Sequence, residues 1–211
     1  MSMTRRTIGW LAATLLSFAA LGAHAQAKAP EALIKEVSTD VLDAVKADKS
    51  IQAGDIRKVI ALVDQKVLPY VNFQRMTASA VGRYWKQATP DQQKRLQDEF
   101  KLLLVRTYSG ALSQVSSEQT VELRPMRSTP ADNEVVVRTE IKGKGDPIQL
   151  DYRLEKAGDS WKIYDVNVLG VWLVENYRNS FAQEIGANGV DGLIAKMAER
   201  NKSAAAAGAK S

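Results

Sequence analysis

The spacing of apolar residues changes twice along this chain, and these changes limit the folds it can adopt. Between about residues 30 and 114 apolar residues recur at the spacing of helix turns. Between 120 and 168 they alternate with polar residues, and from about 170 the helical spacing returns. A period near 3.6 predicts helices with one buried face, and a period of 2 predicts half-buried strands. This order predicts an α+β fold with helices packed against a sheet.

Local signals mark the starts of helices in the first zone. Thr89 is followed by Pro90 and Gln92, the pattern of a capping box with proline at the first helical position. Asp55 and Asn72 are placed to cap two earlier helices. The helix after Thr89 is expected to be the longest, with one wide apolar face formed by Leu96, Phe100, Leu103, Leu104, Thr107, Tyr108, Ala111 and Leu112.

The second zone predicts four strands in an antiparallel meander. Its alternating segments are separated by turn-forming clusters at 129–133, 143–146 and 157–159. The alternation is most regular at 148–155, where Leu150 and Tyr152 share a face. Asp165 interrupts the pattern of the fourth strand, which indicates either a bulge with a hydrogen-bonding role or a functional acid. We therefore expect a curved, four-stranded antiparallel sheet.

The third zone predicts helix again. One helical face contains Val171, Val174, Tyr177, Phe181 and Ile185. Gly186 and Gly189 are expected to break this helix, leaving a last short helix at 192–197. Residues 203–211 are mostly small, and we expect them to form a disordered tail.

The first 25 residues have the order of a bacterial export signal. Arg5 and Arg6 precede an apolar run at 8–21, and the small residues at 23–25 precede a cleavage site before Gln26. We expect residues 1–25 to be removed, residues 26–202 to form a single domain, and the protein to reach the periplasm. No later stretch has 18 consecutive apolar residues, so we expect the chain not to span a membrane.

The composition of the chain disfavours several kinds of catalysis. His24 is the single histidine and lies in the leader, and the chain has no cysteine. The mature protein would therefore lack the usual general base, thiol nucleophiles and disulfides. Acidic residues show no clustered metal-binding spacing, and no G-x-S-x-G, P-loop or G-x-G-x-x-G motif occurs. We expect no metal and no cofactor, and we expect binding in place of turnover.

The net charge and the carboxylates leave open which partners the chain binds and whether two acids act together. Two of the 29 basic residues lie in the leader, so 27 basic and 24 acidic residues give the mature chain a net charge of +3. Because no run is rich in Arg and Lys, we expect no nucleic-acid partner, whereas anionic lipid headgroups or an acidic partner fit. Asp151, Asp165 and Asp191 are the carboxylates that could act as a pair.

Five blocks of residues resemble the MlaC family, periplasmic phospholipid carriers also called toluene-tolerance auxiliary proteins. The blocks lie in family order and are VLPYVNFQRM at 67–76 with GRYWKQATP at 82–90, LVRTY at 104–108, WKIYDVNVLGV at 161–171, NYR at 176–178 and GVDGL at 189–193. The resemblance covers nearly all of the chain after the leader. It implies a cone-shaped fold related to nuclear transport factors, with an apolar pocket between sheet and helices.

The resemblance also implies a function and a site. Members of the family carry phospholipid between an outer-membrane lipoprotein complex and an inner-membrane ABC transporter, which maintains outer-membrane lipid asymmetry. From the family and the facing of each residue, the expected lipid-binding residues are Phe73, Met76, Val81, Leu103, Leu104, Tyr108, Val137, Leu150, Tyr152, Ile163 and Val171. The expected residues of the pocket mouth or partner surfaces are Arg83, Lys86, Arg106, Arg138, Arg153 and Arg178.

Two other hypotheses remain open on the sequence. The first is an enzyme on the same cone-like scaffold, such as an isomerase or dehydratase that uses Tyr and Asp side chains in its cavity; it requires two titratable groups to meet there. The second is an interaction module with a solid core, which would have no cavity. The periodicity of the apolar faces fits a packed core as well as a hollow one.

Overall fold

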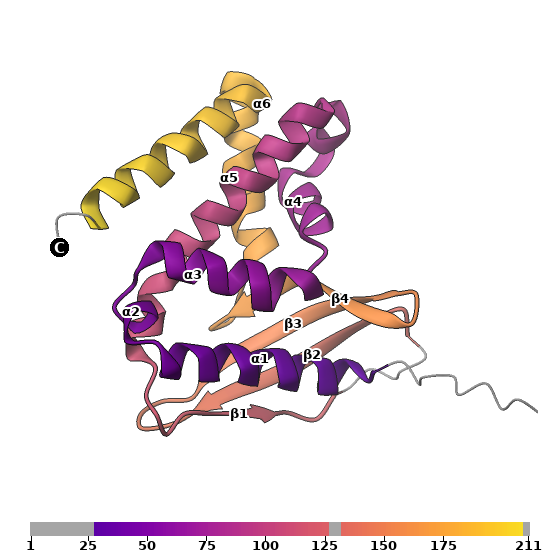
Figure 1. Cartoon of the computed structure of the whole chain (residues 1–211). Coiled ribbons are helices and arrows are strands. Elements are labelled where there is room, and N and C mark those ends of the chain that lie inside the picture. The colour runs from indigo at the N-terminus through magenta and orange to yellow at the C-terminus, as the bar shows by residue number, and fades with distance from the viewer. Residues whose placement is uncertain (1–27, 127–131, 209–211) are drawn as a thin grey trace, which may run out of the picture.

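The computed structural model describes residues 28–126 and 132–208. An antiparallel sheet lies at the bottom of the view in Figure 1, helices α1 and α3 run along it, and helices α4, α5 and α6 form an upper helical lobe. This arrangement confirms the predicted α+β class. The predicted signal peptide at 1–25 and part of the predicted turn at 129–133 lie outside the described residues.

The first zone forms helices that begin at the predicted caps. The helices are α1 (Pro30–Ala47), α2 (Lys49–Gln52), α3 (Ile56–Leu62), α4 (Phe73–Val81) and α5 (Pro90–Tyr108). Thr89 and Gln92 form the predicted capping box, with backbone–side-chain hydrogen bonds of 3.0 and 3.2 Å. The side chains of Asp55 and Asn72 accept backbone N–H groups at the starts of α3 and α4. These caps supply partners for amide groups that a helix start leaves unpaired.

Short helical segments follow α3, α4 and α5. They are the π-helix η1 (Val63–Val67) and the 3₁₀ helices η2 (Leu68–Tyr70), η3 (Gly82–Gln87) and η4 (Ser109–Gln114). Pro69 lies inside η2, where the continuous helix from α3 has ended, as its missing N–H requires.

The sheet has five strands, so the prediction of four was wrong. They are β1 (Thr120–Leu123), β2 (Glu134–Lys142), β3 (Ile148–Ala157), β4 (Ser160–Val168) and β5 (Val171–Trp172), paired in that order. The added strand forms because Leu169 and Gly170 both have positive φ and turn the chain back onto β4. Val171, predicted on a helix face, therefore lies in β5 and is 49% exposed.

A β-bulge in β4 explains the interrupted pattern around Asp165. Leu154 pairs with Ile163 and Arg153 pairs with Asp165, so Tyr164 is an extra residue opposite β3. Because of this extra residue, Ile163 and the later valines of β4 lie on the same face of the sheet.

Asp165 has the structural hydrogen-bonding role that the sequence left as one alternative. It is 1% exposed, and its carboxylate accepts the backbone N–H groups of Val166 at 2.9 Å and Val174 at 3.1 Å. Arg153 donates to it at 3.0 Å. Burial raises the pKa of the Asp165 carboxyl, although these hydrogen bonds oppose the shift. Asp165 thereby joins β4 to the first turn of α6.

Helix α6 (Leu173–Gly208) is two helices joined at Gly189. Gly189 has φ 71° and ψ −178°, a conformation that glycine adopts without a Cβ clash, whereas the predicted break at Gly186 does not occur. After Gly189 the chain folds back along the lobe (Figure 1). The final helix is longer than the predicted 192–197, and it extends through residues 203–208 of the predicted disordered tail.

Two packed regions fix the position of the sheet relative to the helices. In the helical core, Phe100 contacts Tyr177 and Phe181 with ring centroids 5.1 and 5.3 Å apart. In the α1–sheet core, α1 covers one end of the sheet with Leu33, Ile34 and Val37 packed against Val135, Val137, Leu154, Trp161 and Ile163. The other end of the same sheet face is left without such a cover. Within the described residues, no helix is both long enough and apolar enough to cross a membrane.

Candidate functional site

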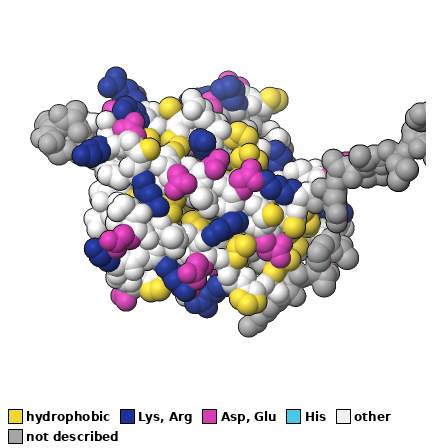
Figure 2. Space-filling view, turned by 60° about the horizontal axis from the view of Figure 1, so that its bottom comes forward, with side chains coloured by type: hydrophobic (Ala, Val, Ile, Leu, Met, Phe, Trp, Pro, Cys, Tyr) yellow, Lys and Arg dark blue, Asp and Glu magenta, His cyan; other side chains and the backbone are white. Residues whose placement is uncertain are grey.

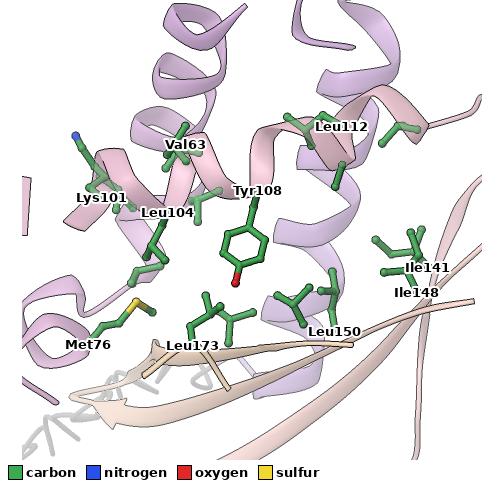
Figure 3. A pocket seen from close by; sticks show the side chains of 18 of the residues that line it. Val63, Met76, Lys101, Leu104, Tyr108, Leu112, Ile141, Ile148, Leu150 and Leu173 are labelled. Atoms are coloured by element: carbon green, nitrogen blue, oxygen red, sulfur yellow. The ribbon is translucent and has the colours of Figure 1, made fainter. Parts of the chain in front are cut away.

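A cavity of about 380 Å³ lies between α5 and the uncovered end of the sheet. Its size falls within the usual range for small-molecule sites. Figure 3 shows Leu104 and Tyr108 projecting from α5 toward Leu150 and Leu173 on the opposite side. The remaining lining comes from η1, η2, α4, η4 and the three central strands, and from Val71, Val115 and Gln119 between these elements.

Apolar side chains form nearly the whole wall. Met76, Val105 and Leu173 are buried, whereas Ala111 and Gln114 of η4 are exposed. The lining is therefore more exposed at η4 than around Met76. Such a wall favours a ligand that is itself largely apolar, because polar groups inside it would lose their hydrogen bonds to water.

Few polar groups reach this cavity. The lining includes Tyr108, Lys101, Gln114 and Gln119. Burial raises the pKa of the Tyr108 hydroxyl, which keeps it neutral, and Lys101 pairs with Asp64 at 2.9 Å. Among the described lining residues there is no Asp or Glu, so the Tyr and Asp combination of the enzyme hypothesis is not assembled in this cavity.

The candidate carboxylates lie apart from the cavity. Asp151 faces Arg138, with Nε and Oδ2 3.8 Å apart, and burial raises the pKa of its carboxyl. Asp191 accepts a hydrogen bond from Gln92 at 3.0 Å and lies 3.6 Å from Arg95. No group of three or more Asp, Glu, His or Cys side chains that could hold a metal is found in the described part of the chain.

The structure divides the predicted lipid-binding residues into two sets. Those that line the cavity are Phe73, Met76, Leu104, Tyr108 and Leu150. Val81 and Leu103 lie in the helical core, while Val137 and Ile163 lie in the α1–sheet core. Tyr152 packs against that second core, and its hydroxyl lies 3.2 Å from Ser38 Oγ.

Several lining residues were missed on the sequence. They are Val63, Val67, Leu68, Val71, Val105, Ala111, Leu112, Val115, Ile141, Ile148, Val166, Val168 and Leu173, together with Lys101, Gln114 and Gln119. The alternation at 148–155 could have identified Ile148, since it shares a face with Leu150. Val166 and Val168 were hidden by the bulge, which shifts the facing of every later residue in β4.

Three of the predicted surface cations share one groove on the helical lobe. Arg83, Lys86 and Arg178 line a hollow of about 670 Å³ together with the aromatic rings of Tyr84 and Trp85. In the described residues, no carboxylate forms an ion pair with any of the three. By contrast, basic and acidic side chains are interspersed on the face seen in Figure 2.

The other predicted cations lie elsewhere. Arg153 pairs with Asp165 and stacks 3.9 Å from the centre of the Trp172 ring. Arg138 faces Asp151 on the sheet. Arg106 borders a separate hollow near the end of α6, and its buried Nε has no hydrogen-bond partner among the described residues.

Together, the fold and the cavity define an α+β protein with an apolar binding pocket between a curved sheet and helices. The family model described as MlaC protein matches residues 35–199. The chain therefore belongs to the MlaC family, as the sequence blocks predicted.

Known proteins with similar sequences and structures agree. The chain is 26% identical over 172 residues to the intermembrane phospholipid transport system binding protein MlaC of Haemophilus influenzae, covering 80% of each. It is 25% identical over 185 residues to the toluene tolerance protein Ttg2D of Pseudomonas putida, covering 84% of this chain and 86% of that protein. A phospholipid-binding protein from Ralstonia solanacearum, solved in complex with a phospholipid, is 46% identical with a TM-score of 0.79, covering 83% of this chain and 98% of that structure.

Proposed function

We propose that this protein is a periplasmic phospholipid carrier that holds acyl chains in the cavity between α5 and the sheet. The observation that supports this most is the apolar wall of the cavity, which has no carboxylate in its described lining. The similar Ralstonia protein, solved with a phospholipid, supports the same ligand class. The five predicted residues in the wall, with Ile148 and Val168 beside them, would contact the tails.

The free-energy cost of exposing acyl chains to water explains why such a carrier is needed. Two acyl chains hold about 30 methylene groups, and exposing each costs about 0.8 kcal/mol, so bare transfer would cost on the order of 25 kcal/mol. A pocket with an apolar wall removes most of that cost and needs no proton transfer. We therefore propose a carrier without enzymatic activity, active as a single domain at 26–202 after export.

Native mass spectrometry of the protein purified from a bacterial periplasm tests this proposal. We expect the mature chain to carry phospholipid at a ratio near one, and we expect the lipid mass to disappear after denaturation. A lipid-free spectrum under conditions that preserve other noncovalent complexes would contradict the carrier function.

We further propose that the groove lined by Arg83, Lys86 and Arg178 binds an acidic surface of a protein partner. The partners in this proposal are the inner-membrane ABC transporter and the outer-membrane lipoprotein complex. Three cations without carboxylate partners favour an acidic surface, and the adjacent aromatic rings offer apolar contact area. Helix α4 contributes to both hollows, since Met76 lines the cavity while Ser79 lines the groove. A partner in the groove would therefore contact the helix that forms one wall of the cavity.

Charge reversal tests the groove. The triple variant Arg83→Glu, Lys86→Glu, Arg178→Glu should keep its bound lipid and transfer it to the purified transporter about tenfold more slowly at low salt. The control reverses three exposed lysines elsewhere, Lys35→Glu, Lys49→Glu and Lys202→Glu, and changes the net charge equally. Equal slowing in the two triple variants would assign the effect to net charge and would rule out the groove.

A further inference from the structure

Tyr108 supplies the only hydroxyl group in the described lining of the cavity. It is the last residue of α5, and Figure 3 shows its ring projecting from that helix toward Leu150 and Leu173, with the oxygen at the far end. The polar atom of this side chain therefore lies inside the cavity, between the helix and the sheet, where a bound molecule would meet it.

The Tyr108 hydroxyl has no hydrogen-bond partner among the described residues. By contrast, the hydroxyl of Tyr152 on the sheet lies 3.2 Å from Ser38 Oγ. The hydroxyl of Tyr164, also on the sheet, donates to the Glu134 carboxylate at 2.9 Å. Burial raises the pKa of the Tyr108 hydroxyl, so this group keeps its proton and remains a donor. A buried tyrosine hydroxyl usually has a partner, and here a bound molecule is the group in a position to supply one.

The surroundings of this hydroxyl favour an uncharged acceptor. The neighbouring wall residues Leu104, Leu150 and Leu173 are apolar. Lys101 is the one cation in the described lining, and it already pairs with Asp64 at 2.9 Å. A phosphate group placed here would be a buried charge without a counterion, which is costly. A carbonyl oxygen is uncharged and accepts hydrogen bonds, and in a phospholipid such carbonyls belong to the esters that join the acyl chains to glycerol.

The position of Tyr108 along the cavity fits such an ester. Tyr108 directly precedes η4, where the lining residues Ala111 and Gln114 are exposed. Met76, on the α4 side of the cavity, is buried. A lipid whose tails extend toward Met76 and whose headgroup stays in water near η4 would place its ester groups close to Tyr108.

We propose that the Tyr108 hydroxyl donates a hydrogen bond to an ester carbonyl of the bound lipid, so that the cavity selects lipids by the linkage between glycerol and acyl chain. This inference rests on the proposed lipid-carrying function and names the chemical group that the cavity recognises. It predicts selectivity for ester-linked over ether-linked lipids, because an ether has no carbonyl oxygen.

Competition between two matched lipids tests the proposal. Lipid-free mature protein is mixed with equal amounts of diester phosphatidylglycerol and its diether analogue with the same chain lengths, and the bound lipid is counted by native mass spectrometry. We expect the wild type to prefer the diester about fivefold, as one net hydrogen bond would give. Tyr108→Phe removes only the hydroxyl group and should bind both lipids equally.

A control variant and a spectroscopic measurement separate this contact from a general effect of losing a tyrosine hydroxyl. Tyr177→Phe removes the same group in the helical core, outside the described lining of the cavity, and should keep the preference. With a diester lipid isotopically labelled at its carbonyl carbons, we expect the infrared carbonyl band of the bound lipid to lie at lower frequency in the wild type than in Tyr108→Phe.

Several results would overturn the inference. They are equal binding of both lipids by the wild type, a preference that survives in Tyr108→Phe, the same loss of preference in Tyr177→Phe, and a carbonyl band that does not differ between the wild type and Tyr108→Phe. Failure of the wild type to bind either lipid would instead overturn the carrier function.

Discussion

The two ends of the inner face of the sheet have the same kind of sequence and different surroundings. At one end, Val137, Leu154 and Ile163 are almost fully buried beneath α1. At the other, Ile148 and Leu150 are only partly buried and face the cavity. The strand β3 passes through both ends with one unbroken alternation.

The difference between these ends lies in the helix opposite them. Helix α1 places Leu33, Ile34 and Val37 against the sheet and fills the space. Over the cavity end, α5 directs Phe100 and Leu103 into the helical core instead, whereas Leu104 and Tyr108 project across the cavity toward the sheet (Figure 3). Alternation in a strand therefore specifies which residues face inward, and the opposing layer decides whether they form a core or a wall.

Truncating one leucine at each end should produce the largest contrast. Leu154→Ala is expected to lower the free energy of unfolding by about 2–5 kcal/mol, because Leu154 is fully buried and its loss leaves a cavity. Leu150→Ala should cost less than about 1 kcal/mol in lipid-free protein, since that side chain already borders empty space. Urea unfolding of both variants measures this, and equal losses would mean that the two ends are packed alike.

A charge in the cavity wall should affect lipid more than a charge on the surface. Leu104→Lys is expected to lower lipid occupancy about tenfold, because acyl chains cannot hydrate a buried ammonium group. Glu122→Lys, on the exposed face of β1, serves as the control and should leave occupancy unchanged. Native mass spectrometry of both variants supplies the comparison. Similar occupancies in the two would show that Leu104 does not face the ligand.

The smallest expected effect concerns Asp165, which lies at the boundary between the cavity wall and the helical core. Its pKa is raised by burial, so the folded protein binds its proton more tightly than the unfolded chain does. This contribution to stability is greatest below the ordinary pKa of an aspartate and declines as the pH rises through the raised pKa.

Asp165→Asn removes that titration. The stability of the wild type relative to this variant should therefore fall as the pH rises from about 3 to 8. Urea unfolding across this pH range measures the difference, with Asp91→Asn as an exposed control. A difference that stays constant with pH, or grows as the pH rises, would contradict the burial effect.

The sequence predicted local structure better than it predicted the site. The caps at Asp55, Asn72 and Thr89 were confirmed because they depend on hydrogen bonds within a few residues. By contrast, Leu103 and Leu104 are neighbours on α5 that point to different sides, one into the helical core and one into the cavity. A wide apolar stripe does not show which of the two leucines faces the cavity, because the residues that each one contacts lie far away in the sequence.

The remaining errors also arise from nonlocal contacts. The fifth strand depends on a turn at Leu169 and Gly170, and a leucine with positive φ gives no signal in its residue type. Gln119 was missed as a lining residue because its place in the wall depends on the close approach of Gly143, which is distant in the sequence. The sheet residues behind the bulge were missed because one unpaired residue reverses their expected facing.

The bulge in β4 determines which residues of that strand face the cavity. Ile163 and Val166 are an odd number of residues apart, yet both lie on the inner face because Tyr164 has no partner in β3. A chain that lost Tyr164 would keep the same pairing and the same apolar wall. A chain that kept Tyr164 and straightened the strand would turn Asp165 and Asn167 inward. Whether β4 presents valines or Asp165 and Asn167 to the cavity thus depends on whether Tyr164 stands unpaired, and the residue types of the wall do not reveal this.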